Sequence, residues 1–61
     1  MRYQVIKMPK NFIAEFVVVD TNRHPKHFTE ITHDDLETGR VELFDFEDEA
    51  LAQADFANYV H

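Results

Sequence analysis

Apolar residues of this chain gather in short runs separated by polar segments that contain proline or glycine. Residues 2–8 place apolar side chains on alternating sides well enough to predict a β-strand that ends before Pro9. The segment 9–11 favours a turn. Residues 12–19, FIAEFVVV, predict a second strand that returns as a hairpin with the first. Residues 41–46, VELFDF, alternate again and predict a further strand.

The run 12–19 is apolar on both faces of the predicted strand, with Glu15 as its only charge. One face carries Phe12, Ala14, Phe16 and Val18, and the other carries Ile13, Val17 and Val19. Such a strand needs cover on both sides.

The segment between the hairpin and residue 41 is less regular. Residues 28–32, FTEIT, predict a short additional strand. After it, Thr32 is placed to cap a single helical turn with Asp35 in the reciprocal position, and Gly39 suits the left-handed residue that ends such a turn. A plain hairpin loop over residues 32–39 is the alternative.

A helix is predicted over the last fourteen or so residues, EDEALAQADFANYV, which contain no glycine or proline. Asp45 is expected to cap this helix, and acids in its first turn suit the helix dipole. Its expected inward face carries Ala50, Ala54, Phe56, Ala57 and Val60. Leu51 and Tyr59 lie off that face and need another partner or stay partly exposed.

These elements predict a single α+β domain over residues 1–61: a small antiparallel sheet of three or four strands followed by one C-terminal helix packed on one face. One helix covers one face, so the second apolar face of the run 12–19 is expected to be buried in a homodimer, sheet to sheet or by edge pairing. The expected dimer interface is Phe12, Phe16, Val17 and Val19. The alternative is that the long polar loop after residue 19 folds over that face.

The chain has 61 residues and a net charge of -6, unevenly distributed. Residues 1–28 carry five bases and two acids, or +3, whereas residues 29–61 carry one base and ten acids, or -9. This charge makes direct binding of nucleic acid or an anionic membrane unfavourable. Neither a signal-peptide core nor a membrane-spanning run is seen, so a cytoplasmic protein is expected.

Serine and cysteine are absent and Gly39 is the only glycine, which leaves no serine or cysteine nucleophile and no glycine-rich phosphate loop. We therefore expect a non-enzymatic protein without a cofactor. His24, His27 and His33 form the one candidate metal-binding set, with Asp34 and Asp35 beside His33. A solvated histidine loop is the simpler interpretation, because Pro25 prevents a helical pairing of the first two.

Nine of the twelve acids fall between Asp34 and Asp55. A solvated surface with favourable helix-dipole interactions is one interpretation. The other is a row of carboxylates that imitates a phosphate backbone, which would make the protein a DNA-mimicking inhibitor of a nucleic-acid-binding enzyme.

The ending LFDFEDEALAQADFANYV, an aromatic strand, an acidic cap and an alanine-rich helix, resembles the closing pattern of short accessory proteins of phages and mobile elements. The resemblance covers about a third of the chain and implies a small accessory protein that binds and modulates an enzyme. It carries over no functional residue, because the shared pattern is structural.

The sequence thus favours a small interaction or regulatory protein that uses an acidic surface to bind a basic protein partner. Leu51 and Tyr59, flanked by Asp48 and Asp55, are the predicted contact residues. The alternatives are the DNA-mimicking inhibitor and a small metal-binding protein built on the histidine loop.

Overall fold

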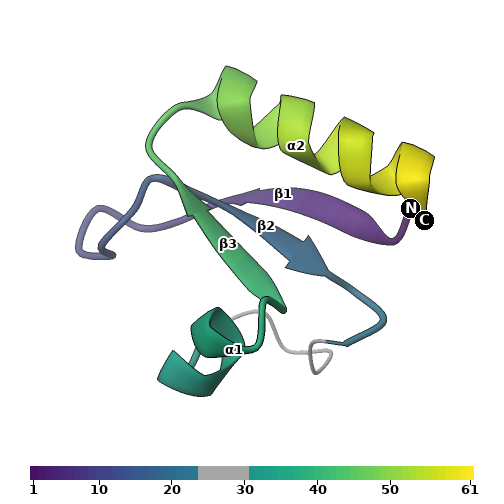
Figure 1. Ribbon diagram of the computed structural model, residues 1–61. Helices are drawn as coiled ribbons and strands as arrows, with labels where there is room; N and C mark the ends of the chain where they lie inside the picture. The colour runs from purple at the N-terminus through teal and green to yellow at the C-terminus, as the bar shows by residue number, and fades with distance from the viewer. Residues whose placement is uncertain (24–30) are drawn as a thin grey trace.

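The computed structural model describes residues 1–23 and 31–61. Its elements, in chain order, are β1 (Tyr3–Lys7), β2 (Phe16–Asp20), α1 (His33–Glu37), β3 (Val41–Phe44) and α2 (Glu47–Val60) (Figure 1). The strands form one antiparallel sheet in the order β1-β2-β3, with β2 in the centre. The predicted α+β class, with a three-stranded antiparallel sheet and a C-terminal helix, is confirmed.

The additional strand predicted at residues 28–32 falls mostly outside the described residues. Its described part, Ile31 and Thr32, lies directly before α1 and is not in a strand.

The hairpin differs from the prediction, because β2 begins at Phe16 and not at Phe12. The amide of Phe12 donates to the carbonyl of Pro9 at 3.0 Å, and that of Met8 donates to the carbonyl of Glu15 at 2.8 Å. In the β1–β2 pairing, Lys7 lies opposite Phe16. If this pairing continued to a tight two-residue turn, Asn11 and Phe12 would be the two turn residues. Such turns need positive φ angles, which a bulky aromatic residue disfavours, so the chain forms a wider connection.

The sheet has an apolar core on each face. On the first face, Phe16 and Val18 of β2 pack with Ala50 and Ala54 of α2. On the second face, Val17, Val19 and Val41 form a cluster. Partly buried side chains from other segments pack against this second cluster: Ile6, Met8, Phe12, Ile31 and Leu36.

The second face of β2 is therefore covered within a single chain, and the premise of the expected dimer interface is wrong. Val17 and Val19 are fully buried without any partner, and Phe16 is buried as well. Phe12 is half-buried and is itself part of the cover. These four residues leave little surface for a second copy.

The helical turn predicted after Thr32 is present as α1, in place of a plain loop. Thr32 Oγ1 accepts from the amide of Asp35 at 3.3 Å, and Asp35 Oδ2 accepts from the amide of Thr32 at 2.9 Å. Gly39 ends the turn with a φ of 73°. α1 thereby positions Leu36 on the second face of the sheet.

α2 departs from the prediction at its start and along one side. Its N-cap is Phe46, with no side-chain capping bond, so the expected cap by Asp45 is wrong. Ala50, Ala54 and Ala57 are buried as predicted. Phe56 and Val60 are exposed, because the helix contacts the sheet through a narrow stripe of small residues and not through a broad face.

Candidate functional site

The side of α2 that points away from the sheet carries the predicted contact residues. We call this set, all exposed, the outer surface of α2: Asp48, Leu51, Ala52, Asp55, Phe56 and Tyr59. Spacings of three, four and seven residues align them along one side of the helix. The structure thus brings the four residues predicted from the sequence together and adds Phe56 to them.

Large apolar side chains are unusually open to solvent on this surface. Leu51 is 48% exposed, Phe56 63% and Tyr59 90%. Val60 and Phe46, near the two ends of the helix, are exposed as well. Exposed apolar side chains that lie on one side of a helix are typical of surfaces that contact another molecule.

The charges on α2 are all negative. Its residues include four acids, Glu47, Asp48, Glu49 and Asp55, and no lysine or arginine. Among the ion pairs formed within the described residues, none involves an acid of α2. The acids therefore give this surface an uncompensated negative field.

The acids before β3 are in a different situation. Arg40 Nη1 lies 3.1 Å from Asp34 Oδ2 and 3.3 Å from Asp35 Oδ1. Asp35 is also buried. The nine clustered acids thus divide into a group around α1, whose charge Arg40 offsets in part, and a group on α2 and the strand before it that is unpaired within the described residues.

Asn58 fixes how α2 sits on the sheet. Its Oδ1 accepts from the amide of Tyr3 at 2.9 Å, and its Nδ2 donates to the carbonyl of Tyr3 at 3.0 Å. The two bonds hold the end of α2 against β1 and determine which side of the helix faces solvent. Sequence reasoning missed this residue, although a polar amide next to a stripe of buried alanines was a usable signal.

A partly buried ion pair joins the start of β1 to the end of β2. Arg2 donates from Nε to Asp20 Oδ1 at 2.8 Å and from Nη2 to Oδ2 at 2.9 Å, while the amide of Asn22 donates to Oδ1 at 3.1 Å. The hydrogen bonds from Arg2 lower the pKa of the Asp20 carboxyl, although burial opposes the shift. Correspondingly, the bond to Asp20 raises the pKa of Arg2. With every partner supplied by the chain itself, this pair is structural.

The histidine candidates gain no support as a metal site. His24 and His27 lie outside the described residues. His33 is exposed, and its Nε2 lies 3.0 Å from Glu37 Oε1 one turn along α1. Within residues 1–23 and 31–61, no group of three or more suitable side chains is arranged to hold a metal ion.

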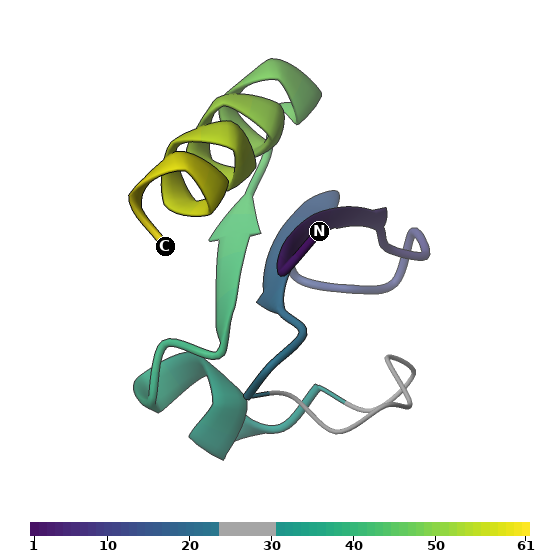
Figure 2. The ribbon, with the colours of Figure 1, turned by 90° about the vertical axis from the view of Figure 1, so that its right-hand side faces the viewer.

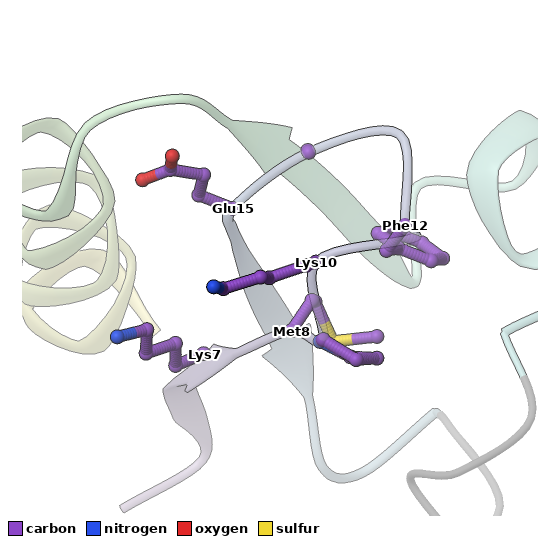
Figure 3. Close-up of a pocket in the computed structure, with 7 residues that line it drawn as sticks. Lys7, Met8, Lys10, Phe12 and Glu15 are labelled. Atoms are coloured by element: carbon purple, nitrogen blue, oxygen red, sulfur yellow. The ribbon is translucent and has the colours of Figure 1, made fainter.

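A small hollow of about 320 Å³ lies under the hairpin connection. Lys7, Lys10 and Glu15 extend from one side of it, while Met8 and Phe12 lie on the other (Figure 3). The two apolar residues belong to the cover of the second core. The hollow combines opposite charges with core side chains and points to no particular chemistry.

Comparison with known proteins gives no relative: no protein-family model matches the chain, and no curated protein or solved structure matches it. Neither helix in the described part of the chain has the length and apolar character needed to cross a membrane.

Proposed function

We propose that this chain is a non-enzymatic interaction protein whose outer surface of α2 binds a basic protein partner. The observation that carries the proposal is the exposure of Leu51, Phe56 and Tyr59 on a helix whose only charges are acids. A few anchors, among which tyrosine is enriched, supply most of the binding energy at protein interfaces, while neighbouring side chains exclude water from them. The acids add attraction for a basic partner and exclude acidic ones.

The absence of serine and cysteine from the sequence supports a role without covalent catalysis. Binding through a helix that is already folded suits such a small domain, because the surface needs no rearrangement to accept a partner. A small accessory protein of this kind would act by occupying or shaping the surface of the protein that it binds.

Phosphate mimicry is less well supported than protein binding. Arg40 lies beside both Asp34 and Asp35 and offsets one of their two negative charges, which weakens the proposed row. Large apolar side chains, Phe56 and Tyr59, stand next to Asp55 where a phosphate backbone would offer only charge. If binding to the partner survived replacement of these apolar side chains but not replacement of the acids, the result would favour mimicry.

Replacing both Leu51 and Tyr59 by alanine is expected to weaken partner binding about tenfold or more without unfolding the domain, because both side chains are exposed. The measurement is affinity capture from the native cell extract at low and high salt, followed by titration of the purified partner. Capture should decline as salt rises, since the acids contribute attraction that salt screens.

The matched control is Ile13→Ala, which removes an equally exposed apolar side chain from the hairpin connection, away from α2. It should capture the same partner as the unaltered protein. Equal capture by all three proteins would contradict the proposal, and so would a set of captured proteins that is predominantly acidic. Melting of the double variant would mean that the two side chains are core residues.

A further inference from the structure

The outer surface of α2 has a small residue at its centre. Ala52 is exposed, and its side chain is the shortest of the set. Asp48 lies one turn before it. Asp55 and Phe56 lie one turn after it, and Tyr59 lies two turns after it. No other element of the described chain lies over this side of the helix (Figures 1 and 2). The four longer side chains around Ala52 therefore extend beyond it toward solvent.

The carboxylates and the phenylalanine ring lie on opposite sides of Ala52. At about 100° per residue, Asp48 and Asp55 fall on one side of Ala52 and Phe56 falls on the other. Side chains on a helix lean toward its N-terminus, so the ring of Phe56 leans over the turn that holds Ala52. The ring of Tyr59 leans in the same way over the turn that holds Asp55. A cation placed over Ala52 would therefore meet carboxylates on one side and aromatic groups on the other.

The polar groups of this surface are free within the described part of the chain. Asp48, Asp55 and the hydroxyl of Tyr59 form no side-chain hydrogen bond or ion pair with residues 1–23 or 31–61. Carboxylates and rings that the fold itself does not use remain available to a partner.

Elsewhere the chain shows what a carboxylate beside a tyrosine ring holds. The guanidinium of Arg2 lies 5.2 Å from the centre of the Tyr3 ring. It also donates two hydrogen bonds to the carboxylate of Asp20, at 2.8 and 2.9 Å. A guanidinium suits both partners at once, because its flat face stacks on a ring while its edge donates two parallel hydrogen bonds. Lysine offers only a point charge without a flat face. The groups around Ala52 repeat this combination without the arginine.

The arginines of the chain itself are occupied. Arg2 and Arg40 form the ion pairs described above, and Arg23 donates to the carbonyl of Thr38 at 3.1 Å. The sequence contains no other arginine. An arginine that binds around Ala52 therefore comes from another molecule.

We propose that the basic partner presents an arginine to the outer surface of α2, and that its guanidinium lies over Ala52 between the acids and the rings. This inference rests on the proposed function and names the chemistry of the partner: an arginine in preference to a lysine. Asp48 and Asp55 attract the cation, and the rings of Phe56 and Tyr59 supply the preference. Leu51, beyond the carboxylates, contacts apolar atoms of the same partner without contributing to the preference.

The test compares two peptides of equal length and charge, one in which arginine alternates with serine and one in which lysine alternates with serine. Each peptide is titrated into the isotope-labelled protein at low salt. The shifts of backbone amide signals in NMR spectra give both the affinity and the place of binding. We expect the arginine peptide to bind about fivefold more tightly than the lysine peptide. The largest shifts should fall at Ala52 and Phe56.

Phe56→Leu shows whether the rings cause the preference. The variant keeps both acids and an exposed apolar side chain but loses an aromatic face, so the arginine peptide should lose most of its advantage. The lysine peptide should bind as before. Phe46→Leu is the matched control, because Phe46 and Phe56 are each 63% exposed and Phe46 precedes α2. It should keep the full preference, and so should Phe56→Tyr, which retains a ring.

Equal binding of the two peptides to the unaltered chain would overturn the inference, and so would binding of neither. An arginine preference that Phe56→Leu leaves intact would overturn it as well, because the rings would not be its cause. None of these results decides the proposed function, which depends on whether replacing Leu51 and Tyr59 by alanine abolishes capture of the partner. Loss of capture together with equal binding of the peptides would mean that α2 binds a basic partner without selecting arginine.

Discussion

Phe16→Ala is expected to lower the free energy of unfolding by about 3 kcal/mol or more. The ring of Phe16 is buried between β2 and α2, where it packs with Val18, Ala50 and Ala54. The helix side of this core is made of alanines, which are too small to fill the cavity that the lost ring would leave. A domain of this length has a total stability of about 3–9 kcal/mol, so the variant should be partly or wholly unfolded at room temperature. Urea unfolding followed by circular dichroism measures the loss.

Phe46→Ala provides the matched control, because it makes the same chemical change at a ring that is largely exposed. Its effect should stay within about 0.5 kcal/mol. Val17→Ala should also act on folding, since Val17 is fully buried in the second core. If either core variant kept its stability and instead changed the state of association, β2 would be an interface strand and not the centre of a monomer core.

Features of the fold that depend on neighbouring residues were predictable from the sequence. Thr32 and Asp35 cap each other within one turn, and Gly39 ends the same turn, so α1 follows from local chemistry. Likewise Ala50 and Ala54 lie one turn apart, which was enough to identify the side of α2 that packs on the sheet.

The cover of the second face was not predictable in the same way. It combines Phe12 and Met8 from the hairpin connection with Ile31 and Leu36 from a segment some twenty residues later. Neither group has a periodic pattern, and Leu36 is a single apolar residue among polar neighbours. Counting only regular elements left this face of β2 open and led to a dimer through residues that the chain already buries.

Prediction of the candidate site was closer to the structure. Leu51 and Tyr59 were expected off the inward face, and both are exposed. Phe56 was assigned to the core because its position on a helical projection falls at the margin of a broad inward face. The contact between α2 and the sheet is narrow, because it is made by a stripe of alanines. Phe56 lies beside this stripe, so it faces solvent and adds to the apolar part of the outer surface of α2.

Asp20→Asn is expected to cost about 2 kcal/mol of unfolding free energy at neutral pH, because the carboxylate accepts two hydrogen bonds from Arg2 and one from the amide of Asn22. An asparagine turns one acceptor into a donor that faces the guanidinium. The loss should be smaller than for a fully buried ion pair, since water still reaches part of Arg2. Urea unfolding measures the difference, and Asp45→Asn, an exposed acid with no capping bond to α2, should change little.

The pH dependence of the unfolding free energy separates the contribution of the Asp20 charge from that of its neutral hydrogen bonds and packing. Arg2 lowers the pKa of Asp20 below its ordinary value of 3.8, so the folded state holds the ionised carboxylate more strongly than the unfolded state. The resulting stabilisation is fully present above about pH 4 and is lost as the pH falls from there through the folded-state pKa. The stability difference between the unaltered chain and Asp20→Asn should therefore shrink toward pH 2, whereas that of Asp45→Asn should stay near zero. A difference that persists unchanged at pH 2 would mean that Asp20 acts through neutral hydrogen bonds and packing, and that its charge contributes nothing to holding β1 against β2.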